Sequence, residues 1–214
     1  MTTEVLTQIT SSLVRCEPDS TARLTREALE AGVAPLAIIN QGLVPGMEIV
    51  GEKFQAGEYF LPQMVIAANA MQQAMGLLEP ELHARQQVVE TPGTMVIGTV
   101  KGDIHEIGKS LVATMMSANG FRVHDLGVDV SPATFVGKVK ETEANLLGLS
   151  ALLTTTMTAQ REVILAIEEA GIRDQIKVIV GGAPVTQEWA ESIGADGYAE
   201  DAVGAVALGK RLVG

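Results

Sequence analysis

The feature that most constrains the fold is a regular alternation of short apolar runs and helical stretches in the second half of the chain. The strand-like runs are residues 94–100, 121–126, 145–150, 176–180 and, more weakly, 196–199. The helical stretches between and after them are residues 106–118, 132–142, 156–170, 185–193 and 201–212. Short apolar strands separated by helices are typical of a parallel sheet that is covered on both faces. The pattern predicts a flavodoxin-like or Rossmann-like α/β domain with a five-stranded parallel sheet.

The first half of the chain has a different period. Its apolar residues recur at steps of three and four, most clearly in a stripe made of Leu61, Met64, Val65, Ala68, Met71, Met75 and Leu78. This spacing is typical of amphipathic helices, and we expect four of them to form a small bundle. The expected helices cover residues 3–14, 18–31, 34–54 and 61–80, with a bend at Pro45-Gly46 in the third and an end at Pro80 in the fourth. Residues 84–93 lose the period and contain Pro-Gly, which predicts a linker between a helical domain (1–88) and an α/β domain (93–214).

Composition narrows the possible partners. The formal net charge of −11 disfavours nucleic acid and anionic membranes as partners. Cys16 is the single cysteine, so the chain has no internal disulfide, and this favours a reducing compartment. The first ten residues lack the features of a signal peptide, and no apolar run approaches the ~20 residues that a membrane-spanning helix needs. We therefore expect a cytoplasmic protein with neither a nucleic-acid nor a membrane partner.

Three patches that can carry chemistry follow predicted strands. They are Asp103-Ile104-His105, with Gly108 closing the motif, then Ser150, Leu152 and Thr154–Thr156, and then Gly181-Gly182. In a parallel sheet these loops meet at one edge, where open α/β folds bind ligands. Asp103 is close enough to hold one ring nitrogen of His105, which leaves the other free for a metal or for base catalysis. Taken singly, each patch also has an ordinary interpretation, as a loop histidine, a helix cap or a turn.

In this order, Asp-x-His-x-x-Gly, Ser-x-Leu and Gly-Gly together resemble the cobalamin-binding domain of B12-dependent methyltransferases and mutases. The helical half resembles the helical cap of the methyltransferase branch through Gly46-Met47, Val-Gly-Glu-Lys-Phe at 50–54, Gly57-Glu58 and Phe-Leu-Pro-Gln at 60–63. The combination is similar to the small corrinoid proteins of three-component methyltransferase systems, which act on methylamines, methanol, betaines or methoxylated aromatics. It also resembles the cobalamin module of methionine synthase.

The resemblance implies a set of roles in binding cobalamin. His105 would replace the cofactor's own benzimidazole base as the cobalt ligand, oriented by Asp103 and by the hydroxyl of Thr156, at a position where Ser is commoner. The displaced nucleotide tail would enter a slot between the strands. Further cofactor-binding positions on the α/β domain would be Ile104, Gly108, Ser150, Leu152, Thr154, Gly181, Gly182 and Ala202. On the cap, Phe54, Leu61 and Met64 would either contact the methyl-bearing face of the cofactor or belong to the bundle core.

The function implied is that of a corrinoid methyl carrier, with no catalytic residue of its own. Its partners would be a substrate-specific corrinoid methyltransferase, an acceptor methyltransferase that uses a thiol or tetrahydrofolate, and a reductive activase. Ser-Ala-Leu-Leu-Thr-Thr-Thr-Met at 150–157 is most similar to the methylamine group. The alternative is a B12-dependent sensor, a regulatory binding module that shares the cap and the histidine motif.

Overall fold

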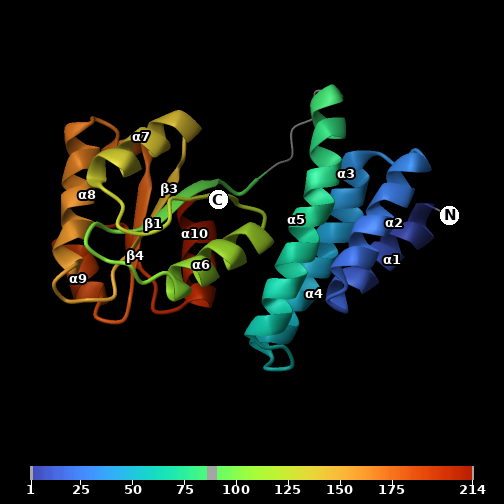
Figure 1. Ribbon diagram of the computed structural model, residues 1–214, viewed down its shortest axis with the longest axis horizontal. Coiled ribbons are helices and arrows are strands. Elements are labelled where there is room, and N and C mark those ends of the chain that lie inside the picture. The colour runs from blue at the N-terminus through green and yellow to red at the C-terminus, as the bar shows by residue number, and fades with distance from the viewer. Residues whose placement is uncertain (1, 86–90, 214) are drawn as a thin grey trace. The chain divides into compact units, whose positions relative to one another are not determined.

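The computed structural model describes residues 2–85 and 91–213, and the chain divides into two compact units, Met1–Glu90 and Thr91–Gly214 (Figure 1). The first unit is helical and the second is an α/β unit. Among the described residues, no helix is both long enough and apolar enough to cross a membrane.

The α/β unit has the predicted five parallel strands. They are β1 (Thr94–Thr99), β2 (Arg122–Asp125), β3 (Leu146–Ser150), β4 (Lys177–Gly181) and β5 (Gly197–Tyr198), in the order β2-β1-β3-β4-β5. The register aligns Thr99 with Ser150 and Ser150 with Gly181, so the ends of β1, β3 and β4 lie in one row. The strand order reverses between β1 and β3, because the chain first adds β2 on one side of β1 and then adds β3 to β5 on the other. Such sheets bind ligands at the carboxyl edge beside this switch point. The predicted fold class is confirmed.

Helices cover both faces of this sheet (Figure 1). They are α6 (Ile107–Ala118), α7 (Pro132–Thr142), α8 (Met157–Glu169), α9 (Gln187–Ser192) and α10 (Ala202–Val213), with a short 3₁₀ turn at Arg173–Gln175. Helices α6 and α10 pack together on one face, and α7 and α8 pack together on the other. The core lies between the sheet and these helices, and Val96, Leu147, Val178 and Phe135 are completely buried in it. Burial on both faces explains why the strands are continuous apolar runs.

The helical unit contains α1 (Thr2–Val14), α2 (Pro18–Glu30), α3 (Pro35–Ile38), a π-helical turn (Ile39–Leu43), α4 (Val44–Gln55) and α5 (Leu61–Ala84). Its core includes Ile9, Leu13, Ile38, Leu43 and Leu78, all completely buried. The four expected helical segments are present, with α3, the π turn and α4 forming the third.

Two details of these helices differ from the sequence prediction. The third segment is interrupted at Ile39–Leu43, upstream of the expected bend at Pro45-Gly46. There the Thr10 hydroxyl of α1 donates to the Gly42 carbonyl over 2.8 Å, and this bond compensates for the wider turn. The fourth helix does not end at Pro80 but continues to Ala84. Leu82, beyond the proline, is 5% exposed, and its burial stabilises the last turn against the missing N–H.

Candidate functional site: the His105 loop and its cavity

The loop after β1 carries His105 to the carboxyl edge of the sheet. Gly102 turns the chain with a φ of +82°, a conformation that glycine adopts without steric cost. The Thr99 hydroxyl donates to the His105 carbonyl over 2.9 Å and ties the loop back to the end of β1. The His105 side chain is 46% exposed, so the imidazole is accessible to a ligand.

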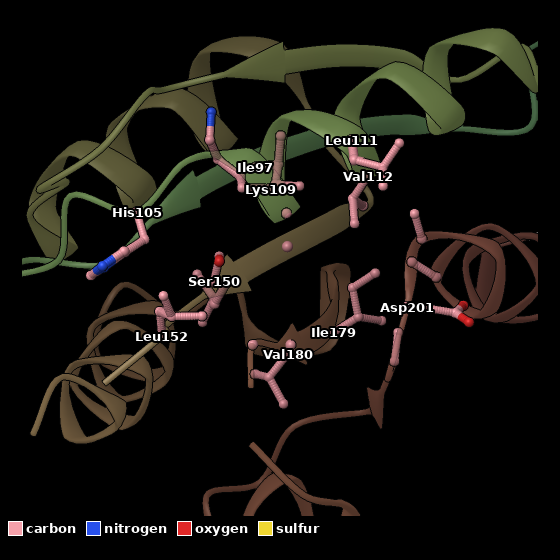
Figure 2. A pocket seen from close by; sticks show the side chains of 18 of the residues that line it. Ile97, His105, Lys109, Leu111, Val112, Ser150, Leu152, Ile179, Val180 and Asp201 are labelled. Carbon is pink, nitrogen blue, oxygen red and sulfur yellow. The ribbon is translucent and has the colours of Figure 1, made fainter. Parts of the chain in front are cut away.

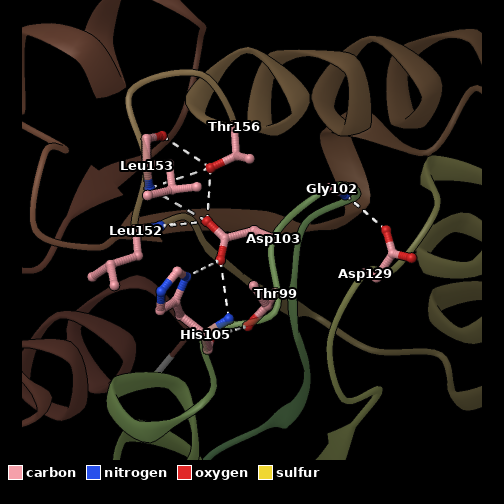
Figure 3. Close-up of polar contacts among 8 residues, drawn as sticks. All are labelled: Thr99, Gly102, Asp103, His105, Asp129, Leu152, Leu153 and Thr156. Carbon is pink, nitrogen blue, oxygen red and sulfur yellow. Dashed lines mark hydrogen bonds and ion pairs between the residues drawn. The ribbon is translucent and has the colours of Figure 1, made fainter.

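Asp103 is the buried centre of this loop, at 1% exposure (Figure 3). Its Oδ1 accepts from the His105 Nδ1 at 2.7 Å and from the His105 backbone N–H at 3.0 Å. Its Oδ2 accepts from the Thr156 hydroxyl and from the Leu152 N–H, each at 2.7 Å. Burial of the carboxyl opposes ionisation, but these donors together hold the pKa of Asp103 well below its usual range.

An ionised Asp103 fixes the tautomer of His105. Because a carboxylate can only accept, Nδ1 of the neutral ring carries the proton and Nε2 keeps its lone pair. Nε2 has no hydrogen-bond partner among the described residues. A neutral imidazole nitrogen oriented in this way is a good metal ligand.

A cavity of about 700 Å³ begins beside His105 and extends between the sheet and α6. In Figure 2, His105 and Leu152 lie at one end, and Leu111, Val112 and Asp201 lie at the other. The predicted site residues that line it are Ile104, His105, Gly108, Ser150, Leu152, Gly181, Gly182 and Ala202. Asp103 and Thr156 lie outside the lining and act on it through His105. Thr154 is exposed and also lies outside the lining, so the structure gives its proposed contact with the cofactor tail no support.

The interior of the cavity is apolar, and the sequence reasoning missed most of its lining. The strands contribute Met95, Ile97 and Ile179, and α6 contributes Leu111 and Val112. Their signal in the sequence was present but ambiguous, because apolar residues of strands and helices are ordinarily assigned to the protein core. An apolar cavity of this volume is typical of a small-molecule or cofactor site.

The Gly181-Gly182 pair is explained by the nearby backbone. A Cβ on Gly182 would lie 1.8 Å from the Ala151 carbonyl oxygen, and its φ of +129° also disfavours other residues. A Cβ on Gly181 would lie 3.1 Å from the Ala199 carbonyl oxygen. The two glycines therefore allow the chain segments around the cavity to approach closely.

Exposed apolar side chains lie in and directly after the His105 loop and in the loop that follows β3; the sequence analysis named two of them, Ile104 and Leu152, and missed the other two. They are Ile104, Ile107, Leu152 and Leu153, and Ile107 is 86% exposed. Four exposed apolar side chains in these two regions form a surface suited to a broad, partly apolar ligand.

The three predicted residues of the helical unit have different environments. Leu61 is exposed at the start of α5, and Phe54 is half-buried on α4. Met64 is 1% exposed, which favours the bundle-core interpretation for this residue. For Phe54 and Leu61, contact with a ligand stays a prediction.

Two family models match the chain, both described as a B12 binding domain. One covers residues 93–207, which include the whole His105 loop and the cavity lining, and the other covers residues 5–79 of the helical unit. The chain belongs to the B12-binding family of corrinoid proteins. Cobalamin is therefore its cofactor, and the free Nε2 of His105 beside a large apolar cavity fits a cobalt corrinoid with a bulky tail.

Individual relatives cover nearly the whole chain. The trimethylamine corrinoid protein 2 of Methanosarcina mazei is 47% identical over 204 residues, covering 95% of this chain and 94% of the relative. The dimethylamine corrinoid protein 2 of Methanosarcina acetivorans is 46% identical over 210 residues, covering 98% and 96%.

Two solved structures are similar over the same length. A methanol:cobalamin methyltransferase complex from Methanosarcina barkeri contains a chain that matches with a TM-score of 0.90 and 31% identity, covering 98% of this chain and 80% of that one. A cobalamin-binding protein from Desulfitobacterium hafniense matches with a TM-score of 0.72 and 33% identity, covering 98% of both chains.

Proposed function

We propose that this protein is a methyl carrier that holds cobalamin with the cofactor's own base displaced and with Nε2 of His105 as the lower cobalt ligand. The bound cofactor supplies a cobalt centre that accepts and releases a methyl group. The protein binds and orients the cofactor and presents it to partner enzymes.

The observation that carries the proposal is the fixed imidazole of His105. The buried, ionised Asp103 accepts a hydrogen bond from His105 Nδ1 at 2.7 Å, which leaves the lone pair of Nε2 available. The Thr156 hydroxyl and the Leu152 N–H donate to the other oxygen of the same carboxylate. The group that holds the imidazole ring is therefore itself held in place. Such restraint favours ligation because the nitrogen loses little freedom when it binds.

The surroundings of His105 support a displaced base. The exposed side chains Ile104, Ile107, Leu152 and Leu153 offer an apolar seat for the lower face of the corrin ring. The adjoining cavity of about 700 Å³ offers space for the nucleotide tail, with Ser150 as a polar group at its wall. A base held in this cavity is kept away from the cobalt, which leaves that coordination position to His105.

The relatives support a role between two enzymes. Those that are 45–47% identical are named for trimethylamine and dimethylamine, and the similar chain at 31% identity comes from a methanol:cobalamin methyltransferase complex. We infer a methylamine as the methyl source, delivered by a substrate-specific methyltransferase. A second methyltransferase would pass the group to a thiol or to tetrahydrofolate, and a reductive activase would restore the reduced carrier.

The direct test replaces His105 with Ala and compares the visible spectrum of the reconstituted holoprotein with that of the wild type. We expect the wild type to show histidine ligation and H105A to show the spectrum of cobalamin without a lower nitrogen ligand. The matched control is H124A, which removes a half-buried histidine of β2 in the same unit and leaves the spectrum unchanged. Identical spectra for H105A and the wild type would refute histidine ligation.

The carrier role needs a separate assay. Holoprotein mixed with a methylamine methyltransferase and its substrate should become methylated, and this should depend on the partner enzyme. A holoprotein with normal histidine ligation that no corrinoid methyltransferase methylates would favour the sensor alternative.

A further inference from the structure

We propose that Asp129 is a positioning residue for His105, an inference that rests on the proposed cobalt ligation. Asp129 lies in the loop between β2 and α7. Its Oδ1 accepts from the Gly102 N–H at 2.7 Å, and its own N–H donates to the Asp103 carbonyl at 2.9 Å. Figure 3 shows Asp129 on the other side of the His105 loop from Thr156. The loop is therefore held from two sides.

The backbone of Asp129 indicates that this contact is specific. Its φ is +53°, in the left-handed region, and it is one of three described non-glycine residues with a positive φ. Asp and Asn tolerate this region better than other residues do. The left-handed turn lets both the N–H and the carboxylate of one residue reach the His105 loop. Unusual backbone conformations of this kind concentrate at functional sites.

The end of β2, just before this loop, holds the chain on the far side of His105. Asp125, at the end of β2, forms an ion pair with Lys109, which is only 3% exposed and lies on the first turn of α6. Asp125 also accepts from the Gly127 N–H at 2.9 Å, which orders the loop itself. Gly102 precedes His105 by three residues and Lys109 follows it by four, so the end of β2 and the loop after it together anchor the chain on both sides of the proposed ligand.

Anchoring matters here because residues 101–106 form no helix or strand, and five of these six residues are exposed. A metal ligand must stay within about 0.5 Å of its productive position. Asp103 restrains the imidazole ring of His105, and Thr156 restrains the carboxylate of Asp103. Asp129 restrains the backbone that carries both groups. Without Asp129, the loop would sample positions in which Nε2 lies too far from the cobalt.

Two variants separate the carboxylate's hydrogen bond from the backbone conformation. D129N keeps an acceptor oxygen and a residue that tolerates the left-handed region, whereas D129G tolerates that region and loses the acceptor. We expect D129N holoprotein to resemble the wild type. In D129G the equilibrium between ligated and unligated histidine should shift by about tenfold toward the unligated form, the effect of one lost hydrogen bond to a charged group.

The measurements are the visible spectrum and the nitrogen hyperfine splitting in the electron paramagnetic resonance spectrum of the Co(II) form. Both report the lower ligand directly, and a purely structural role of Asp129 would change neither. A D129G protein with a lower melting temperature but wild-type spectra would overturn the inference. A wild-type holoprotein without histidine ligation would instead refute the proposed function, so the two failures are distinguishable.

If D129G does not fold, amide hydrogen exchange in the wild-type protein gives the answer. We expect the Gly102 N–H to exchange slowly although Gly102 is an exposed residue, because Asp129 accepts its proton. Exchange at the rate of a free loop amide would show that the contact is not populated in solution and would overturn the inference.

Discussion

The Thr156 hydroxyl donates to Asp103 Oδ2 over 2.7 Å and joins two segments that are 53 residues apart. The other oxygen of the same carboxylate accepts from His105 Nδ1. Thr156 precedes α8, so the orientation of the imidazole depends on where this helix begins. The carboxylate, the imidazole and the hydroxyl thus form one chain of hydrogen bonds across the edge of the sheet.

Replacing Thr156 with Val should destabilise the α/β unit by about 1–3 kcal/mol, because the buried carboxylate loses a donor while the shape of the side chain is kept. The change can be measured by urea unfolding followed by the fluorescence of Trp189. The chain contains one tryptophan, and it lies in this unit, so the signal reports on the unit alone.

T156S is the matched control for this substitution because it keeps the hydroxyl and removes only the methyl group. We expect T156S to stay within about 1 kcal/mol of the wild type. Equal losses for T156V and T156S would assign the effect to packing and contradict the role of the hydrogen bond.

Gly182→Ala should be much more disruptive than Gly181→Ala. The added Cβ at position 182 would lie 1.8 Å from the Ala151 carbonyl oxygen, whereas at position 181 the nearest atom is 3.1 Å away. The clash forces the backbone beside the cavity to move, at a cost of about 2–5 kcal/mol for overpacking and strained φ together. Unfolding followed by Trp189 fluorescence measures the cost, and similar losses for the two variants would contradict the explanation.

His124 should make the stability of the α/β unit depend on pH. Burial, and then Lys138 and Arg122, lower the pKa of His124 below its ordinary value of 6.5. The unfolded chain then binds more protons than the folded one, so the contribution is complete above about pH 6.5 and is lost as the pH falls through the folded-state pKa. We expect His124→Gln to flatten the fall in the free energy of unfolding between about pH 7 and pH 5.5. Parallel curves for the variant and the wild type would contradict this assignment.

Much of the fold could be predicted because its signals are local. Each strand is a short apolar run, and each patch of predicted site residues follows one directly. The pairing of Asp103 with His105 could also be predicted, because a single residue separates them in the chain. The continuation of α5 past Pro80 could not, because it depends on the burial of Leu82, which only the folded chain provides.

The parts of the site that sequence reasoning missed depend on distant partners. Asp129 contacts Gly102 from 27 residues away, and in the sequence it looks like an ordinary loop carboxylate. Lys109 looks like a solvated charge until the fold places Asp125 beside it. Thr156 is different, because the family resemblance singled it out over Thr154 as the hydroxyl partner of Asp103, and the structure has that hydrogen bond.

The cavity beside His105 predicts how strongly different corrinoids stabilise the protein. Cobalamin carries a nucleotide tail that can occupy the space of about 700 Å³, whereas cobinamide lacks the tail and leaves it empty. A ligand that binds only the folded state adds about 2.7 kcal/mol to the free energy of unfolding when its concentration is a hundred times its Kd. At equal concentrations, cobalamin should therefore raise the melting temperature measured by calorimetry well above the value with cobinamide, because burying the tail against Leu111, Val112 and Ile179 tightens binding. Equal shifts for the two corrinoids would show that the tail stays outside the cavity. The displaced base would then have to be held somewhere else on the protein.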